Sequence, residues 1–270
     1  MPTKLAEIQQ MNQIPTYVVE VVANRQIAPR MRRVTVGGED LARFQPKGPD
    51  QFLYLLLPPP GMDELTVDTE FTWTGFRRMP KEQRPVGAYY TVRHHRPDQN
   101  EIDLDMVLHE SHDPDRGHAA RWASEASPGD PLALWGPRIC YEPGDSVTDV
   151  YAFVDETGLP AACCLAESLP KGRRAHLFIE VDGPEDELPV PASEAVTVTW
   201  LHRKGRAPGS TDLLESCAQQ LAAPDPVTTY VYGGAESRAM KAIRKYVRRN
   251  WKLPKEAVSL VPYWRRDDSD

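Results

Sequence analysis

Five of the seven histidines lie close together in the sequence, at positions 94, 95, 109, 112 and 118. Imidazole side chains are common metal ligands, and two of them at helical spacing can share one metal ion. His109 and His112 are three residues apart, but the segment around them has no helical pattern of apolar residues. We therefore predict that these histidines surround a surface loop and that the chain has no metal site of its own.

A run of cations near the carboxyl end is the second group that could carry chemistry. The segment 236–250 has the periodicity of a helix, with Met240, Ile243 and Val247 on one face. Its other positions carry Lys241, Arg244, Lys245, Arg248 and Arg249. Exposed cations on a helix are usually only solvated, but in a chain of net charge -7 such a face could also steer an anionic substrate.

The acidic turn Asp155-Glu156-Thr157 follows a short apolar run at 151–154. A helical pattern begins directly after it, so Thr157 could simply cap that helix. The same turn lies at the carboxyl end of an expected strand, which is where open α/β sheets bind ligands. Both interpretations, a helix cap and a ligand site, remain open on this pattern alone.

The elements that would position these residues differ between the two halves of the chain. The first half contains short alternating or apolar runs separated by turns, together with one expected helix over 117–126. Strands are expected at 17–22, 33–36, 51–57, 88–93, 102–108 and 132–135. Many short antiparallel strands with one short helix indicate a small β-barrel.

The second half alternates strands with helices. Strands are expected at 151–154, 175–180, 196–201 and 229–232, and helices up to residue 169, over 211–221 and over 236–250. This alternation predicts a parallel sheet with helices on its faces. A polar segment at 142–148 separates the halves, so we predict a barrel domain over residues 1–145 and an α/β domain over residues 146–270.

The composition argues against several classes of protein. A net charge of -7 is unfavourable for binding nucleic acid. No run approaches the ~18 apolar residues of a membrane-spanning helix, and the first residues have no apolar segment typical of a signal peptide. The four cysteines form no CxxC pair, which indicates buried thiols in a reducing compartment. We therefore expect a cytoplasmic protein with no nucleic-acid partner and no membrane insertion.

Five segments, taken together, resemble the siderophore-interacting protein family. They are Tyr90-Thr91-Val92-Arg93, Ala120-Arg121-Trp122-Ala123 with the turn and strand that follow it, Asp155-Glu156-Thr157 with Leu159-Pro160-Ala161, Trp200-Leu201-His202-Arg203, and Tyr263-Trp264-Arg265-Arg266. Each is weak alone, but their order and spacing hold over nearly the whole chain. The resemblance implies a ferredoxin-reductase-like fold, in which an antiparallel flavin-binding barrel precedes a parallel-sheet nucleotide-binding domain.

The resemblance also implies an oxidoreductase that passes electrons from NADH or NADPH through FAD to a ferric siderophore and releases Fe(II). Tyr90 and Thr91 would lie against the flavin as its catalytic contacts. Further FAD contacts would be Val92, Arg93, His109, Gly117, His118, Ala120, Trp122 and Ala123. The nicotinamide nucleotide would meet Asp155, Glu156, Thr157, Arg203 and Glu236. Cations facing the ferric chelate, in the open mouth between the domains, would be Lys241, Arg244 and Arg265.

Four positions depart from the family's pattern. Ala88 replaces the first Arg of the flavin motif, Ala120 replaces a Ser or Thr, and Val154 and Ala235 each replace a Gly. Losing one charged and one neutral hydrogen bond to the flavin would cost ~3 kcal/mol, which tight binding can survive.

The departures also fit two other hypotheses. One is a family member without normal flavin or nicotinamide use, which binds a small organic substrate in the interdomain cleft and catalyses a redox-neutral biosynthetic step. The other is a siderophore carrier without enzymatic activity, for which the basic helix is the only argument.

Overall fold

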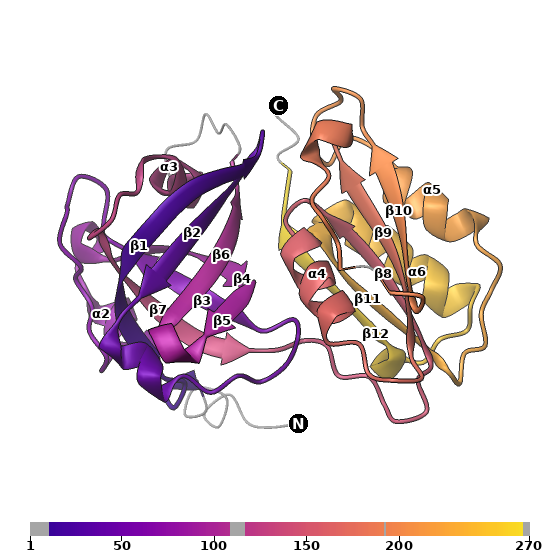
Figure 1. Ribbon diagram of the computed structural model, residues 1–270, viewed down its shortest axis with the longest axis horizontal. Coiled ribbons are helices and arrows are strands. Elements are labelled where there is room, and N and C mark those ends of the chain that lie inside the picture. The colour runs from indigo at the N-terminus through magenta and orange to yellow at the C-terminus, as the bar shows by residue number, and fades with distance from the viewer. Residues whose placement is uncertain (1–10, 109–116, 192, 267–270) are drawn as a thin grey trace. The chain divides into compact units, whose positions relative to one another are not determined.

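The computed structural model describes residues 11–108, 117–191 and 193–266. His109, one of the expected FAD contacts, lies outside these described residues. The chain forms two compact units, one of Met1–Lys47 and Gln51–Arg138, and the other of Gly48–Asp50 and Ile139–Asp270 (Figure 1). Among the helices that the structure describes, none is both long enough and apolar enough to cross a membrane.

The first unit is an antiparallel sheet of seven strands. They are β1 (Thr16–Ala28), β2 (Met31–Gly37), β3 (Phe52–Leu57), β4 (Val86–Thr91), β5 (His94–Arg96), β6 (Glu101–Val107) and β7 (Pro131–Arg138). Their order across the sheet is β4-β3-β7-β1-β2-β6-β5. The sheet curls into a barrel, since the backbone N–H of Arg93, just beyond edge strand β4, donates to the carbonyl of Asp103 on β6 (2.9 Å). The predicted barrel is confirmed.

Among the elements that lie wholly within the described residues, two α-helices accompany the barrel, α2 (Trp73–Arg78) and α3 (His118–Glu125). The sequence analysis expected α3 and missed α2, a short helix whose first turn is capped by the hydroxyl of Thr72. Helix α3 buries Ala119 and Ala123 in the barrel core. The amide of Asn24 on β1 donates to the carbonyls of Ala123 (2.9 Å) and Ala126 (2.8 Å), which fixes the end of α3 to the barrel.

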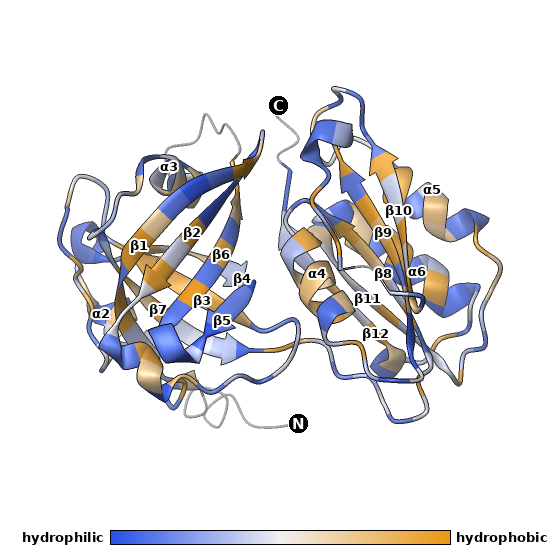
Figure 2. Ribbon diagram, viewed as in Figure 1, coloured by the Kyte–Doolittle hydropathy of each residue, from blue (hydrophilic) through white to orange (hydrophobic). Residues whose placement is uncertain are grey.

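The second unit is a parallel sheet, as predicted, but it has five strands where the sequence indicated four. Its strands are β8 (Asp149–Asp155), β9 (Arg174–Val181), β10 (Val196–His202), β11 (Thr229–Glu236) and β12 (Val258–Trp264), in the order β10-β9-β8-β11-β12. Helix α4 (Leu159–Glu167) covers one face, and α5 (Leu213–Gln220) and α6 (Ser237–Arg249) cover the other (Figure 1). Both faces are covered, and the central parts of β8 and β9 are accordingly apolar, at 150–154 and 177–179 (Figure 2).

The strand order defines where this sheet can bind a ligand. From β8 the chain proceeds to β9 and β10 on one side, and then returns to β11 and β12 on the other. Open α/β sheets bind ligands outside the carboxyl ends of the strands at such a switch point. The expected location is therefore the edge where β8 and β11 end. Strand β12, which pairs with β11 and forms one edge of the sheet, was not expected from the sequence.

Candidate cofactor sites

A buried carboxylate, that of Asp155, holds together the carboxyl edge of the parallel sheet. Asp155 is the last residue of β8 and is 5% exposed. Its Oδ1 accepts hydrogen bonds from the backbone N–H (2.9 Å) and the hydroxyl (2.5 Å) of Thr157. Its Oδ2 accepts from the backbone N–H of Glu236 (3.1 Å) and from the indole Nε1 of Trp264 (2.7 Å). One side chain therefore joins the ends of β8, β11 and β12 to the turn that precedes α4.

The protonation of Asp155 reflects this buried position. Burial raises its pKa to about 6, and the neighbouring Glu156 carboxylate adds to the rise. The hydrogen bonds from Thr157 and Trp264 act in the opposite direction, because they stabilise the ionised form. At neutral pH the carboxylate is therefore mostly ionised, and its oxygens accept hydrogen bonds from donors within the protein.

Glu236 connects the same edge to α6. Its carboxylate accepts from the backbone N–H of Arg238 and so caps the first turn of α6. The other oxygen accepts from the backbone N–H of Arg266 (3.3 Å), which follows β12. An acidic cap satisfies a free helix amide and is favoured by the helix dipole.

Arg203, directly after β10, forms a second ionic centre. It is 1% exposed, and its guanidinium donates to both carboxylate oxygens of Glu156. It also lies 3.8 Å from Glu180 Oε1, which accepts a hydrogen bond from the Thr211 hydroxyl (2.8 Å). Burial raises the pKa of Glu180 to about 7, although Thr211 and Arg203 both oppose the rise. A buried cation needs such close partners to offset the loss of hydration.

A cavity of ≈ 380 Å³ lies against these groups. It is lined by the carboxyl ends of β8, β9 and β11, by the loop before α5 and by the start of α6, at the switch point of the sheet. Its polar lining has five carboxylates, two hydroxyls and three guanidinium groups, from Asp155, Glu180, Asp212, Glu215, Glu236, Ser210, Thr211, Arg206, Arg238 and Arg266. Hydroxyls, carboxylates and arginines are the groups that bind the sugars and phosphates of a nucleotide.

Gly158 explains how the turn tolerates Val154. A Cβ atom at Gly158 would lie 2.2 Å from the carbonyl oxygen of Gly234 and 2.9 Å from Cβ of Val154. Val154 is fully buried. Gly158 therefore leaves room for the Val154 side chain and for the close approach of the turn to β11.

On the barrel, the end of β4 presents a free hydroxyl. Thr91 is 5% exposed, and its Oγ1 is buried with no hydrogen-bond partner among the described residues. Tyr90 packs against the barrel core, and burial raises the pKa of its phenol. An unpaired buried hydroxyl is costly, so a ligand that accepts a hydrogen bond there would be stabilised.

The start of α3 lies next to this strand, since α3 packs against β4. Its N-cap is Gly117, with φ 82°, and no side chain caps the helix among the residues described. His118 Nδ1 is also buried without a partner in the described part of the chain. Free backbone amides at a helix start are suited to an anion such as phosphate.

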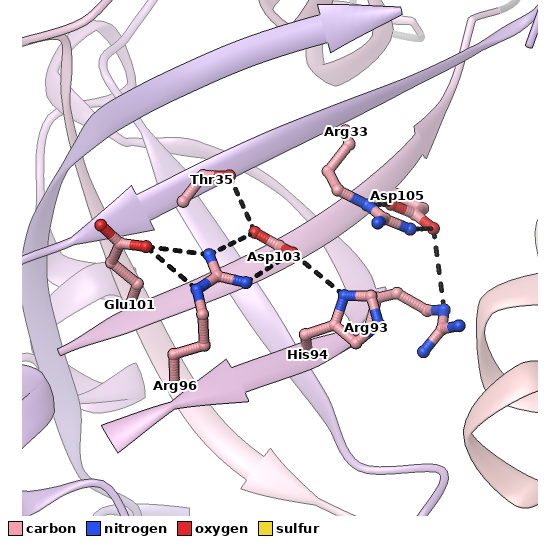
Figure 3. Close-up of polar contacts among 8 residues, drawn as sticks. All are labelled: Arg33, Thr35, Arg93, His94, Arg96, Glu101, Asp103 and Asp105. Carbon is pink, nitrogen blue, oxygen red and sulfur yellow. Dashed lines mark hydrogen bonds and ion pairs between the residues drawn. The ribbon is translucent and has the colours of Figure 1, made fainter. Parts of the chain in front are cut away.

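A ladder of charges covers the outer face of β6 (Figure 3). Asp103 accepts from Thr35 (2.7 Å), from Arg96 (2.7 and 2.8 Å) and pairs with His94 (3.0 Å). Burial opposes these contacts, but together they hold the pKa of Asp103 well below its usual range.

The neighbouring carboxylate, Asp105, orients two arginines. It accepts two hydrogen bonds from Arg33 (2.6 and 2.7 Å), and its Oδ2 lies 4.0 Å from Nε of Arg93. Arg93, the last residue of the flavin motif, is thereby held at the end of β4 and is 8% exposed.

The structure brings some of the predicted residues together and separates others. Asp155, Thr157 and Glu236 share one hydrogen-bond network, and the Glu156–Arg203 ion pair begins at the next position along the chain. The side chains of Val92 and Ala123 face the barrel core, where Trp122 also packs, and Ala120 is buried, so a cofactor could meet these residues mainly through backbone atoms.

The three cations expected to face the chelate do not line one cavity. Lys241 lines a groove between α5 and α6, whereas Arg244 donates to the backbone carbonyl of Leu260 on β12. Arg265 is exposed beyond the end of β12.

Three residues that make these contacts had no role assigned from the sequence. They are Trp264, which donates to Asp155, and Glu180 and Thr211, which lie beside Arg203. Glu180 could have been found, because it lies near the carboxyl end of a predicted parallel strand, as Asp155 does. Trp264 could not, because its partner Asp155 is 109 residues away and β12 was not expected.

An antiparallel barrel followed by a parallel sheet with a cavity at its switch point is the ferredoxin-reductase-like fold, which is a fold of flavin-dependent oxidoreductases. Residues 20–141 match the model of the siderophore-interacting FAD-binding domain, and residues 147–267 match that of siderophore-interacting proteins. The chain belongs to the siderophore-interacting protein family.

Similar proteins agree with this assignment over nearly the full length. The chain is 34% identical over 263 residues to an uncharacterized protein of Mycobacterium tuberculosis, covering 93% of this chain and 91% of the relative. It is 27% identical over 259 residues to the ferric vibriobactin reductase of Vibrio cholerae, covering 94% and 90%. The crystal structure of a siderophore utilization protein from T. fusca superposes with a TM-score of 0.80 at 32% identity, covering 95% of each chain.

The barrel residues fit FAD in two respects and lack one contact. The unpaired Thr91 hydroxyl suits a flavin ring atom, and the uncapped start of α3 suits a pyrophosphate. Ala88 packs against the core and offers no charged contact in place of the family's arginine. The net fit favours a bound flavin.

Replacing Trp264 with Phe should destabilise the second unit, because it removes one of the donors to buried Asp155. We expect a loss of about 1–2 kcal/mol in the free energy of unfolding, measured by urea denaturation, and a larger loss for Asp155→Ala. The control is the same replacement made in the Asp155→Ala background, because a double-mutant cycle separates the hydrogen bond from the change in packing. An equal loss on replacing Trp264 in both backgrounds would contradict the role assigned to Trp264.

Gly158→Ala adds only one methyl group but should lower the stability of the second unit substantially. Its Cβ would collide with backbone as well as with Val154, and backbone cannot move aside cheaply. We expect a loss of about 2–4 kcal/mol in the free energy of unfolding. Gly172→Ala is an informative comparison, because a Cβ there meets no atom within 4 Å and only the positive φ of 88° opposes it. A thermal midpoint that Gly158→Ala leaves unchanged would refute the proposed close approach.

Glu180 should make stability depend on pH. The folded chain keeps this proton up to about pH 7, whereas the ordinary pKa is 4.5, so the folded state binds more protons between these values. The contribution is fully present below pH 4.5 and is lost as the pH rises through 7. Glu180→Gln should flatten this part of the profile of unfolding free energy against pH, and Glu185→Gln, at an exposed position, should not. Identical profiles for Glu180→Gln and wild type would exclude a buried titrating Glu180.

Proposed function

We propose that the chain is an NAD(P)H-dependent, FAD-containing reductase that converts Fe(III) bound to a siderophore into Fe(II). The observation that carries the proposal is the unpaired Thr91 hydroxyl beside the uncapped start of α3, within the segment that matches the siderophore-interacting FAD-binding domain. The ferric vibriobactin reductase of Vibrio cholerae supports the substrate class, because it resembles the chain over both units.

The chain's own contribution to this chemistry is positioning and charge. A bound flavin supplies the conversion between a two-electron donor and one-electron acceptors, so one NAD(P)H suffices for two ferric ions. Thr91 would donate its hydroxyl hydrogen to the flavin ring, and the amides at the start of α3 would hold the pyrophosphate. The cavity at the switch point would take the nicotinamide nucleotide, with Ser210 and Arg206 as candidate contacts.

The residues predicted to contact the nicotinamide nucleotide do not all remain candidates, because some of them are already bonded within the chain. Asp155 and Glu156 are occupied by internal donors, so we assign them to shaping the cavity. Both Glu236 oxygens and the Thr211 hydroxyl are likewise used within the chain, so these residues also shape the cavity. Arg238 lines the cavity as well and is a further candidate to meet the nucleotide. For the anionic chelate we retain exposed Arg265 as a candidate. Fe(II) is bound by hard oxygen chelators more weakly than Fe(III), so reduction would release the metal.

Flavin binding is the direct test of this proposal. The purified protein should be yellow or should take up added FAD, and anaerobic NADPH or NADH should bleach the flavin absorbance. Bleached protein should then reduce a ferric siderophore, detected with a ferrous-specific chromogenic chelator. A colourless protein that takes up no FAD would end the reductase proposal and favour the redox-neutral hypothesis. Chelate binding without reduction would favour a carrier.

Thr91→Val should weaken FAD binding by about five- to tenfold, because the hydrogen bond contributes about 1 kcal/mol. Fluorescence titration of the apoprotein with FAD measures the change. Thr16→Val is the matched control, since Thr16 Oγ1 is also buried in the same barrel without a partner in the part of the chain that the structure describes. Equal FAD affinities for Thr91→Val and Thr16→Val would remove Thr91 from the flavin site.

A further inference from the structure

A groove between α5 and α6 concentrates positive charge in the second unit. It has a volume of ≈ 470 Å³ and is lined on the α6 side by Arg238, Lys241, Lys245 and Arg249, with Ala242 and Tyr246 between them. Glu215 and Gln219 of α5 form the opposite wall. We refer to this feature as the basic groove.

The charge of α6 is unusual for this chain. The helix SRAMKAIRKYVRR contains six cations and no acid, whereas the whole chain has a net charge of -7. Cations four residues apart on one helix face repel each other by about 0.2–0.5 kcal/mol per pair. Lys241, Lys245 and Arg249 form such a series, and none of them is paired with an acid among the described residues. An anionic ligand would relieve this repulsion.

The groove is not explained by the proposed reductase site. The cations that would face a chelate or a nucleotide lie elsewhere: Arg206 and Arg266 line the cavity at the switch point, and Arg265 lies beyond β12. Lys245 and Arg249 line the basic groove and not that cavity. Only Arg238, Ala242 and Glu215 border both.

The spacing of the cations indicates the shape of the ligand. Residues four apart on a helix are separated by ~6 Å along its axis. In an extended peptide, side chains on the same face recur every second residue, at ~6.6 Å. Carboxylates at alternate positions of an extended segment would therefore follow Lys241, Lys245 and Arg249 in register. A concave site suits such a segment better than it suits a flat lipid surface.

We propose that the basic groove binds an extended acidic segment of a partner protein, with carboxylates at alternate positions facing α6. The Glu215 and Gln219 wall offers acceptors and donors to the segment's backbone. The Tyr246 ring between the cations provides an apolar contact. Its hydroxyl already donates a hydrogen bond to the Gln219 carbonyl (3.2 Å). Binding would be strongest at low ionic strength, because the cations are at the surface and are screened by salt.

The proposal is tested with a fluorescent ten-residue peptide in which Glu alternates with Ala, titrated by anisotropy against the full chain. We expect saturable binding that falls steeply with salt and is absent for the same peptide with Gln in place of Glu. Lys245→Glu combined with Arg249→Glu should weaken binding by about tenfold or more, since two surface ionic contacts are reversed. Arg248→Glu, an exposed reversal on the same helix outside the groove, should change it less than about twofold.

Several results would overturn the proposal. Equal weakening by Arg248→Glu and by the groove variant would show non-specific attraction to a basic helix. Equal binding of the Glu and Gln peptides would remove the role of charge. Binding to phosphatidylserine vesicles without binding to the peptide would assign the helix to a membrane surface. Circular dichroism and FAD uptake of each variant show whether folding and the barrel site are retained, and the test does not depend on reductase activity.

Discussion

The hydrogen bonds of one buried carboxylate organise the carboxyl edge of the second unit. Asp155 is bonded to the turn before α4, to the end of β11 and to the indole of Trp264 on β12. Because Glu236 continues this network into α6, and a second set of contacts around Arg203 and Glu180 lies at the ends of β9 and β10, the cavity at the switch point has a largely fixed wall. Such preorganisation reduces the conformational entropy that the protein would lose when a nucleotide binds.

In the barrel, ion pairs on the outer face of the sheet take the place of a central buried carboxylate. Its outer charges are satisfied within the unit, with Asp103 and Asp105 orienting Arg96, Arg33 and Arg93 (Figure 3). Thr91 at the end of β4 and the uncapped start of α3 both offer hydrogen-bonding groups that have no partner among the described residues, and α3 packs against β4. The departures from the family's pattern are also partly compensated, since Gly158 makes room beside Val154. This pattern fits a family member that has modified its cofactor contacts and has kept their framework.

Much of the fold could be predicted because it depends on local periodicity. Alternating runs indicated the barrel, and strands alternating with helices indicated the parallel sheet. Strand β12 was missed because Pro262 and a mixed burial pattern conceal it in the sequence. The Asp155–Trp264 bond joins residues 109 apart, and no local pattern encodes such a pair. Helical periodicity also did not separate Lys241 from Arg244, which face different neighbours because β12 lies beside only one of them.

The central claim is that this framework still holds both a flavin and a nicotinamide nucleotide. A crystal structure of the protein grown with FAD and NADP⁺ tests it most directly. The account predicts the flavin at the end of β4 with an acceptor within hydrogen-bond distance of Thr91 Oγ1, and the nucleotide in the switch-point cavity with the bonds of Asp155 unchanged. A structure in which side chains or an unrelated molecule fill the end of β4 despite excess FAD would contradict it.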